Sequence, residues 1–513
     1  MIKTFIDKLL GKSGAKPKVP KGKRVEVPLA EHGIDLSLVD DNAIRVVKTL
    51  SDAGFEAFIV GGAVRDLLLG LRPKDFDVAT NATPEQVKGL FRRAFIIGRR
   101  FRIVHVVHGR GREHEVIEVS TFRAMVDPAL AEQITGNEKT SRTELAGKTH
   151  AVDATGRVLR DNVWGPQIED AARRDFTVNA MYYDPQKQIV VDYHGGIKDA
   201  KKKVLRMIGD PVTRYREDPV RIVRVVRFAA KLGFSIEPKT RAPIREMASL
   251  LESVPASRTF DEMIKLLQTG HALASIEELR KQGLVGEGQG FFPILDFVLD
   301  SNSRHPDRAK FVNAALADTD RRVAEGKPVA PSFMLACMLW HDVLDGWQRL
   351  RSRGEAPFAA LQQAVDAVFD VRIGDISGRG KLAGDMRDIW LMQTRFDRRT
   401  GNGPYTLVDQ PRFRAGFDFL RLRADAGEVD PELSVWWEQF SLADGERRAD
   451  LIDQAKHEPR RAPAKAAMVA EGTSTPASDP ARKKRRRRRK PASAAGGGQG
   501  SDAGSPGGGG ELD

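Results

Sequence analysis

Two hydrophobic patterns divide the chain. Between residues 36 and 195, strand-like runs such as EAFIV (56–60), RIVHVV (102–107) and EVIEVSTF (115–122) stand among stretches with helical spacing. The connections between these runs vary in length, which favours a mixed α/β domain over regular strand–helix–strand repeats. From Tyr215 onward, apolar residues recur at intervals of three and four, so we expect an almost entirely helical continuation.

The segments outside these patterns are expected to lack a core of their own. Residues 11–28 are interpreted as a basic linker, and residues 124–160 as a mobile loop within the first domain. The chain from about His457 onward is rich in Ala, Pro, Ser, Gly and Arg, which predicts disorder. Residues 1–10 place their apolar side chains on one helical face, as in a short helix that docks on the body or lies on a membrane surface.

Composition narrows the class of protein. The 513 residues allow two to four domains, and a hydrophobic content of 41% excludes both a mostly disordered chain and a multi-span membrane protein. No window approaches about 20 consecutive apolar residues, the length that a transmembrane helix needs. The N-terminus does not resemble a signal peptide, because Asp7 and Lys8 interrupt its apolar stretch. The single cysteine, Cys337, suits a reducing compartment, so we expect a cytoplasmic protein.

Positive charge gathers at the two ends of the chain. The 83 Lys and Arg residues exceed the 70 Asp and Glu residues by 13, and residues 1–24 together with one basic run account for the excess. That run consists of Arg482, Lys483, Lys484, Arg485, Arg486, Arg487, Arg488, Arg489 and Lys490. Adjacent cations repel unless phosphates offset them, which favours nucleic-acid binding over a merely solvated tail. In RRFRIVHVVHGRGR (99–112), the residues expected to contact nucleotide or RNA phosphates, or to rim the cleft, are Arg99, Arg100 and Arg102.

The stretch FIVGGAVRDLLLGLRPKDFDVATNATPEQV (58–87) carries the most specific chemical signal. A buried strand runs into Gly61 and Gly62 and then into a helix, an arrangement that lets the backbone approach an anion closely. Asp75 and Asp77 follow. On a strand they share one face and repel unless a cation lies between them, and such oxygen ligands favour Mg²⁺. Glu118 is the candidate third acid. The alternative is that these acids face solvent at a strand edge.

The segment REDPVRIVRVVRFAAKLGF (216–234) predicts a helix with one apolar and one basic face. Asp218 is placed to cap it and Gly233 to end it, and the basic face consists of Arg221, Arg224 and Arg227. An Asp–Arg pair can offer hydrogen-bonding edges to a nucleobase. The alternative is a solvated arginine face on which Glu217 and Asp218 pair locally with Arg221.

Other conspicuous residues indicate structure rather than chemistry. His341 and Asp342 resemble the pair of metal phosphohydrolases but lack further ligands. His105 and His108 lie three apart in a strand, so they point to opposite faces. We expect the following residues to belong to the core: Trp390, Trp436, Trp437 and Cys337.

Four ordered segments resemble one protein family. They are GGAVRD with DFDVAT, RRDFTVNAMYY (173–183), VDYHGGIKDAKKKVLRMIG (191–209) and REDPVRIVRVVRFAAKLGF (216–234). These segments, within residues 40–270, are similar to the motifs of the nucleotidyltransferase superfamily to which class II CCA-adding enzymes and bacterial poly(A) polymerases belong. The bacterial poly(A) polymerases are the more similar branch, because of IIGRRFRIVHVV (96–107), DIWLMQ (388–393) and the basic tail.

The resemblance implies a role for each matching residue. The implied metal ligands are Asp75, Asp77 and Glu118. The residues implied to hold the incoming triphosphate are Gly61, Gly62 and Arg65. Asp175 is implied to act in the active site together with Asp75 and Asp77, next to the nucleotide-binding Arg173 and Arg174. The residues implied to present edges to the incoming base, in place of a template, are Asp218 and Arg221.

The resemblance also implies the architecture and the reaction. The expected domains are a basic N-terminal extension (1–35), an α/β nucleotidyltransferase head (36–195), a helical neck that recognises the base (196–270), a helical RNA-binding body (271–456) and a disordered Arg-rich tail (457–513). The expected enzyme adds AMP from ATP to RNA 3′ ends without a template, using two Mg²⁺ or Mn²⁺ ions, and promotes RNA decay. RNA-degradation machinery is an expected partner and DNA is not.

Two alternatives stay open. A CCA-adding tRNA nucleotidyltransferase shares every motif of the head, and the basic ends distinguish it from an enzyme that acts on many RNAs. A non-catalytic RNA-binding adaptor would use only the tail, and the retained pair of repelling acids at Asp75 and Asp77 argues against it.

Overall fold

The structure is a computed structural model of the whole chain. It describes residues 22–98, 102–110, 113–124, 132–133, 150–152, 158–285, 291–292, 294–295, 298–299, 306–327, 329–372 and 380–457. All of them belong to the unit that spans residues 1–461. The predicted N-terminal helix, Arg99, Arg100 and the basic run 482–490 lie outside the described residues.

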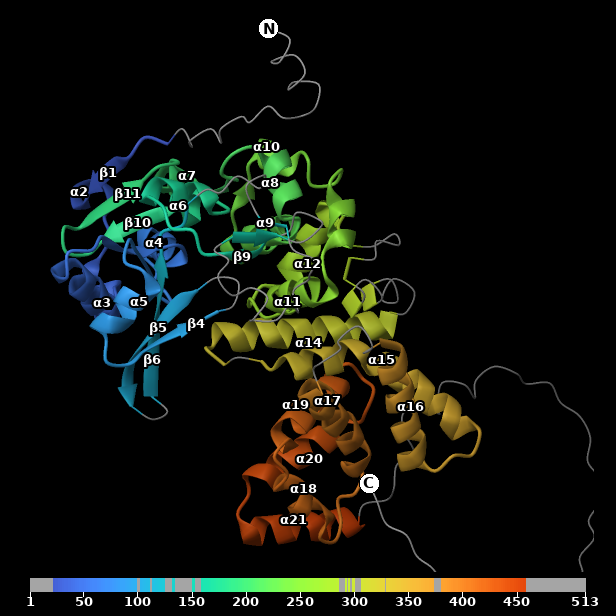
Figure 1. Cartoon of the computed structure of the whole chain (residues 1–513). Coiled ribbons are helices and arrows are strands. Elements are labelled where there is room, and N and C mark those ends of the chain that lie inside the picture. The colour runs from blue at the N-terminus through green and yellow to red at the C-terminus, as the bar shows by residue number, and fades with distance from the viewer. Residues whose placement is uncertain are drawn as a thin grey trace, which may run out of the picture. The chain divides into compact units, whose positions relative to one another are not determined.

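A mixed eight-stranded sheet forms the centre of the first region, as the sequence predicted (Figure 1). Its strand order is β1-β11-β10-β2-β3-β6-β5-β4, and every neighbouring pair is antiparallel except β3 and β6. The strands are β1 (Val25–Pro28), β2 (Ala57–Val60), β3 (Asp77–Thr80), β4 (Ala94–Ile97), β5 (Ile103–Arg110), β6 (Glu113–Thr121), β10 (Met181–Asp184) and β11 (Ile189–Asp192). The three strand-like runs singled out in the sequence correspond to β2, β5 and β6.

Short helices accompany the sheet. They are α2 (Leu29–His32), α3 (Asp41–Asp52), α4 (Gly62–Leu68), α5 (Pro84–Leu90), α6 (Gln167–Arg173) and α7 (Gly196–Lys201), with 3-10 turns η1 (Leu36–Leu38) and η3 (Thr177–Asn179). Helices α3 and α5 cover one face, where Val46 and Val87 join Val78, Val104 and Val119 of the strands in a single buried cluster. We call the sheet with these helices the head.

Among the described residues, a smaller aromatic cluster packs on the opposite face of the sheet. Phe58, Phe122 and Tyr182 pack edge to face or tilted, with ring centroids 6.1 to 6.4 Å apart. Aromatic pairs of this geometry add stability beyond the area that they bury. This cluster lies next to the end of β2, where the candidate site begins.

Two segments interpreted as loops contain strands. The predicted linker 11–28 ends in β1, which pairs with β11, so the sheet begins before residue 36. This interpretation failed because VEVP is too short to produce a periodic signal of its own. The predicted loop 124–160 includes β7 (Glu132–Gln133) and β8 (His150–Val152), which form a small sheet with β9 (Val158–Asp161).

The rest of the described chain is almost entirely helical, as predicted. The neck consists of α8 (Pro211–Glu217), α9 (Val220–Leu232), α10 (Pro238–Arg241), η4 (Ala248–Ser253), α11 (Ala256–Leu267) and α12 (Ala272–Lys281), with the strand pair β12 (Val204–Leu205) and β13 (Ser235–Ile236). The body consists of α14 (Pro306–Ala324), α15 (Pro331–Ser352), α16 (Pro357–Arg372), α17 (Gly380–Met392), η6 (Gln393–Arg395), α18 (Gly403–Val408), α19 (Phe413–Asp425), α20 (Pro431–Leu442) and α21 (Gly445–His457).

The residues expected in the core of the body are buried, namely Trp390, Trp436, Trp437 and Cys337. His341 and Asp342 each meet a partner within the protein: His341 Nε2 lies 2.9 Å from Glu428 Oε1, and Asp342 pairs with Arg308. This agrees with their interpretation as structural residues. In the part of the chain that the structure describes, no helix is both long and apolar enough to cross a membrane.

Candidate active site

Two of the predicted acids stand side by side on the sheet. Asp77 is the first residue of β3 and is in register with Glu118 on the parallel strand β6. Adjacent strands lie about 4.8 Å apart and paired residues point to the same face, so the two carboxylates project together. The alternating neighbours Val78, Ile117 and Val119 enter the core on the other face. We call Asp75, Asp77 and Glu118 the carboxylate row.

Asp75 lies outside the strand in which the sequence placed it. Strand β3 begins at Asp77, and Asp75 is in the bend that precedes it. The expectation of strict alternation from Asp75 onward was therefore wrong, although Phe76 between the two acids is buried in the core. Asp75 still lies close enough for its charge to raise the pKa of Asp77.

The electrostatic environment of Asp77 opposes its ionisation. Surrounding protein desolvates the carboxyl group even though one side of the residue stays open, and the charges of Glu118 and Asp75 repel it; Arg174 acts in the opposite direction. The net effect raises the pKa of Asp77 from 3.8 to about 6. A cation bound between these acids would reduce their mutual repulsion.

Gly61 makes room between Asp77 and an arginine. Its backbone has φ +74°, a left-handed value that favours glycine. A Cβ at this position would lie 3.4 Å from Arg174 Nη1 and 3.9 Å from Asp77 Oδ2. The turn after β2 therefore brings the backbone against both Arg174 and Asp77.

Arg174 rests on the aromatic cluster. Its guanidinium lies 5.4 Å from the centre of the Tyr182 ring and 3.3 Å from Asp170 Oδ2, and the Tyr182 hydroxyl donates to that same carboxylate oxygen. Burial alone would lower the pKa of Arg174, but the Tyr182 hydroxyl and Asp170 raise it. The arginine is thus kept charged at the edge of the carboxylate row.

Arg65 is enclosed more deeply than the sequence indicated. Its side chain is only 4% exposed, and it donates to Asn179 Oδ1 at 2.7 Å and to Asp66 Oδ1 at 2.9 Å. A Cβ on Gly62 would come within 3.3 Å of Arg65 Nη2. The guanidinium therefore lies beneath the glycine turn and supports it from below.

Asp175 has protein partners on both carboxylate oxygens. Oδ2 receives two N–H groups of Arg224, and Oδ1 accepts from the Phe176 backbone and from Asn179. Burial alone would raise the pKa of Asp175, but Arg224 and these donors hold it below its usual value. Arg224 belongs to α9, so this pair ties the head to the neck.

Arg214 reinforces the same junction. From α8 it donates to the backbone oxygens of Arg173 and Arg174, each at 2.8 Å, and to Glu217 at 2.7 Å. We call Asp175, Arg214 and Arg224 the head–neck seam. Burial and the nearby charges of Arg123, Arg214 and Arg221 lower the pKa of Arg173 to about 10. Such a concentration of guanidinium groups favours an anion.

The side chains of Asp218 and Arg221 have other partners than each other. Asp218 accepts from Arg258 of α11, whereas Arg221 donates to Glu217 at 3.1 Å. Asp218 also does not cap α9 with its side chain, because the helix begins at Val220 after Pro219. The capping prediction was wrong, and of the local pairs considered only Glu217–Arg221 forms. The helix does end at Gly233, which has φ +62°.

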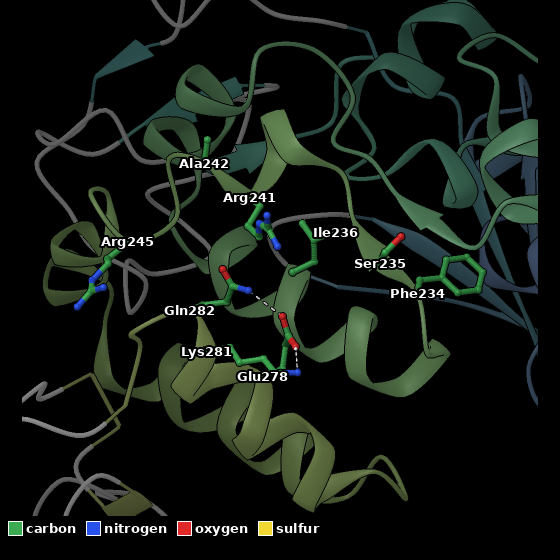
Figure 2. A pocket seen from close by; sticks show the side chains of 9 residues that line it. All are labelled: Phe234, Ser235, Ile236, Arg241, Ala242, Arg245, Glu278, Lys281 and Gln282. Carbon is green, nitrogen blue, oxygen red and sulfur yellow. Dashed lines mark hydrogen bonds and ion pairs between the residues drawn. The ribbon is translucent and has the colours of Figure 1, made fainter.

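A cavity of about 610 Å³ lies in the neck between β13, α10 and α12 (Figure 2). Its basic lining residues are Arg241, Arg245 and Lys281, and Glu278 on its wall accepts from Gln282.

Of the three arginines expected to contact phosphates, Arg99, Arg100 and Arg102, the structure describes only Arg102. Its side chain forms an ion pair with Glu85 of α5.

Several residues that shape the site had no sequence signal. Arg258 and Arg214 contact residues at the site only because the chain folds back onto it, and nothing near them in sequence marks that contact. Asn179, which bonds both Arg65 and Asp175, lies inside a segment that the sequence did single out. A search of that segment for polar side chains would have found it.

The carboxylate row fits a Mg²⁺ ion whose coordination shell is completed by the substrate. Among the described residues, no group of three or more His, Cys, Asp or Glu side chains is close enough to bind a metal by itself. Mg²⁺ in phosphoryl-transfer sites is bound through one or two carboxylates, and substrate phosphates and water complete its shell. The mutual repulsion at Asp77 is the feature that such an ion would remove.

Family comparisons agree with this geometry. A profile described as "Poly A polymerase head domain" matches residues 57–206, which contain the carboxylate row. Profiles described as "Probable RNA and SrmB- binding site of polymerase A" and "Polymerase A arginine-rich C-terminus" match residues 233–297 and 353–491. The fold and the site therefore define a nucleotidyltransferase of the poly(A) polymerase class.

Individual relatives narrow this class. The chain is 42% identical over 417 residues to Poly(A) polymerase I of Haemophilus influenzae (80% of this chain, 87% of the relative) and 39% identical over 484 residues to that of Escherichia coli (92% and 99%). It belongs to the bacterial poly(A) polymerase I family. A CCA-adding enzyme of Lactobacillus helveticus is 37% identical over 224 residues, which cover 44% of this chain and 49% of that enzyme. Among solved structures, a Bacillus stearothermophilus CCA-adding enzyme has a TM-score of 0.41 and 25% identity, and the match covers 81% of this chain and 97% of that one.

Proposed function

We propose that this protein adds AMP from ATP to RNA 3′ ends without a template, in the cytoplasm, and that the resulting tails promote RNA decay through RNA-degradation machinery. The observation that carries the proposal is the position of Asp77. It repels Glu118 and Asp75, faces Arg174 across the Gly61 turn, and lies in a chain of the poly(A) polymerase I family.

The carboxylate row is proposed to hold two Mg²⁺ ions, or Mn²⁺ in their place. When bound, such ions supply a more acidic 3′-hydroxyl and neutralise the charge of the triphosphate. The residues of the chain provide the rest. Arg174 stays charged because of Asp170 and Tyr182, and it stabilises negative charge that develops on the transferred phosphate.

The remaining roles are divided between the head and the neck. Gly61 and Gly62, supported by Arg65, are proposed to border the triphosphate, together with Arg173 and Arg174. Asp218 and Arg221 are proposed to face the base. Each of the two already has a protein partner, Arg258 and Glu217, and these partners fix which hydrogen-bonding edges they offer. Asp175 is proposed to position the neck against the head rather than to touch the nucleotide.

A CCA-adding activity is the second candidate, because CCA-adding relatives match about 44% of this chain. The matches to the poly(A) polymerase I relatives extend over 80 to 92% of the chain and favour polyadenylation. A non-catalytic adaptor is less consistent with two acids held in mutual repulsion.

Nucleotide incorporation separates these candidates. We would supply each nucleotide singly and all four together, with Mg²⁺, to a short generic RNA and to a tRNA that lacks its CCA end. Long A-only tails on the generic RNA are the expected result. Addition of C, C and A to the tRNA, followed by a stop, would establish the second candidate. An absence of incorporation on both RNAs would favour the adaptor.

The basic run 482–490 is proposed to hold RNA without sequence preference. Its deletion should weaken RNA affinity and flatten the dependence of affinity on salt, since each neutralised phosphate releases counterions. The rate on saturating RNA should change little. Equal salt slopes with and without the run would rule out this role.

A further inference from the structure

The carboxylate row continues across two more strands to the edge of the sheet. Asp77 is in register with Glu118, Glu118 with His105 of β5, and His105 with Phe95 of β4. His105 Nε2 lies 3.2 Å from Glu118 Oε1, so the row is linked by a side-chain contact as well as by the backbone ladder. Since paired residues share a face, Phe95 stands on the same face as the acids, three strands away.

The alternation of burial confirms this orientation. Ala94 and Ile96 on either side of Phe95 pack into the core with Val104, Ile117 and Val119. Phe95 instead is 57% exposed, and Ile97, two residues further along the same face, is 36% exposed. Among the described residues, none of the ring contacts involves Phe95. This edge strand therefore presents an aromatic and an aliphatic side chain to solvent, in line with the acids.

An exposed phenylalanine by itself is ordinary, since much of any protein surface is apolar. Its place in this row is what distinguishes Phe95. Three strand spacings amount to about 14 Å, a distance that a few nucleotides of single-stranded RNA cover. An exposed aromatic ring on a sheet is also a surface on which unpaired bases stack. The edge of the row presents Phe95 and Ile97, which suit a base or ribose better than a phosphate.

We propose that the face formed by Phe95 and Ile97 receives the bases near the 3′ end of the RNA, with Phe95 as a stacking platform. The inference rests on the proposed function, because it assigns a path to the RNA that the proposed reaction extends. The occupant is single-stranded RNA, and the row directs its terminal hydroxyl toward Asp77.

Substitution of Phe95 in the full chain tests the stacking role. Phe95→Leu keeps an apolar side chain but removes the ring, and Phe95→Trp keeps a ring. On a short oligoadenylate primer, Phe95→Leu should raise the KM for RNA roughly tenfold and leave kcat within about twofold, because base–aromatic stacking contributes to binding. Phe95→Trp should retain a KM near that of the unaltered protein.

A matched control is available on the body. Phe358 at the start of α16 is 50% exposed and lies in a different region, so Phe358→Leu should leave the KM unchanged. The effect of Phe95→Leu should also shrink on long RNA, where other surfaces contribute to binding. Direct binding of the oligoadenylate, followed by fluorescence anisotropy, should show the same order of variants without any catalytic step.

The outcomes separate the two proposals. If the unaltered protein makes no tails, the proposed function fails, whatever Phe95 does. If it makes tails and Phe95→Leu binds the short primer as well as the unaltered protein and Phe358→Leu do, the stacking proposal is overturned. A changed oligomeric state of Phe95→Leu with unchanged RNA binding would also overturn it, because the edge strand would then serve as a contact between copies of this chain.

Discussion

The carboxylate row and the head–neck seam place acidic side chains in opposite situations. At the row, Asp77 lies beside two other acids, and its pKa rises to about 6. At the seam, Asp175 is more deeply buried, yet its pKa is lowered, because Arg224 and two further donors, Asn179 and the Phe176 backbone, surround it. Burial opposes ionisation in both places, so the difference comes from the neighbours. The repulsion at Asp77 is consistent with the proposed cation at the row, which would relieve it.

The body follows the pattern of the seam. Asp418 meets Arg322 at 2.8 Å, Asp342 meets Arg308 at 2.9 Å, and both pairs are largely shielded from solvent. Retained buried pairs of this kind are weak evidence for stability, since desolvation offsets much of the attraction. They nevertheless mark these acids as satisfied within the chain. The contrast with Asp77 is therefore informative about function.

The largest expected effect is that of Asp77→Asn. Removal of this carboxylate should lower AMP incorporation by on the order of 10³-fold or more, because a metal contributes several kcal/mol to a transition state. The variant should remain folded and at least as stable as the unaltered protein, since it relieves a repulsion. Incorporation of labelled AMP, RNA binding and thermal unfolding would be measured together. Near-normal incorporation would show that the row is not the reaction centre.

Asp175→Asn should lower stability more than activity, the reverse of Asp77→Asn. It removes a charged partner of Arg224 and should lower the free energy of unfolding by roughly 2 kcal/mol, the range of hydrogen bonds to charged groups. Incorporation, measured well below the unfolding temperature, should fall by far less than in Asp77→Asn. A loss of activity as large as that of Asp77→Asn in a protein of unchanged stability would place Asp175 among the catalytic residues instead.

The sequence predicted which residues form the carboxylate row, but not which partners surround the acids of the seam. The glycine turn and the acids were recognisable because their spacing is local, and the strands around them have clear periodicity. The partners of Asp175 and Asp218 were not, since Arg224 and Arg258 lie 49 and 40 residues away. Short strands such as β1 were missed for a related reason: their stability comes from pairing with distant strands, which no local pattern records.

The pH dependence of stability gives a third and smaller difference. The folded protein without metal should bind a proton at Asp77 between the ordinary pKa of 3.8 and the raised value of about 6, so its stability should rise as pH falls through that window. Asp175, with its lowered pKa, should stabilise the fold above about pH 4 and lose that contribution as pH falls further. Melting in EDTA across pH 3.5 to 7 would show Asp77→Asn removing the first slope and Asp175→Asn reducing the second. An unchanged slope between pH 4 and 6 in Asp77→Asn would contradict the repulsion.

The smallest expected effect concerns a pair that is exposed rather than buried. Lys48 and Asp52 lie 2.7 Å apart on one turn of α3, with side chains 59% and 61% exposed. Water and salt screen such a pair, so a double-mutant cycle of Lys48→Ala and Asp52→Ala should give a coupling of only about 0.3 to 0.5 kcal/mol. A cycle of Asp175→Asn and Arg224→Gln should give a coupling several times larger that changes less with salt. If the two couplings were equal, the enclosure of Asp175 would add nothing to its pairing, and the lowered pKa at the seam would need another cause than the neighbours that surround it.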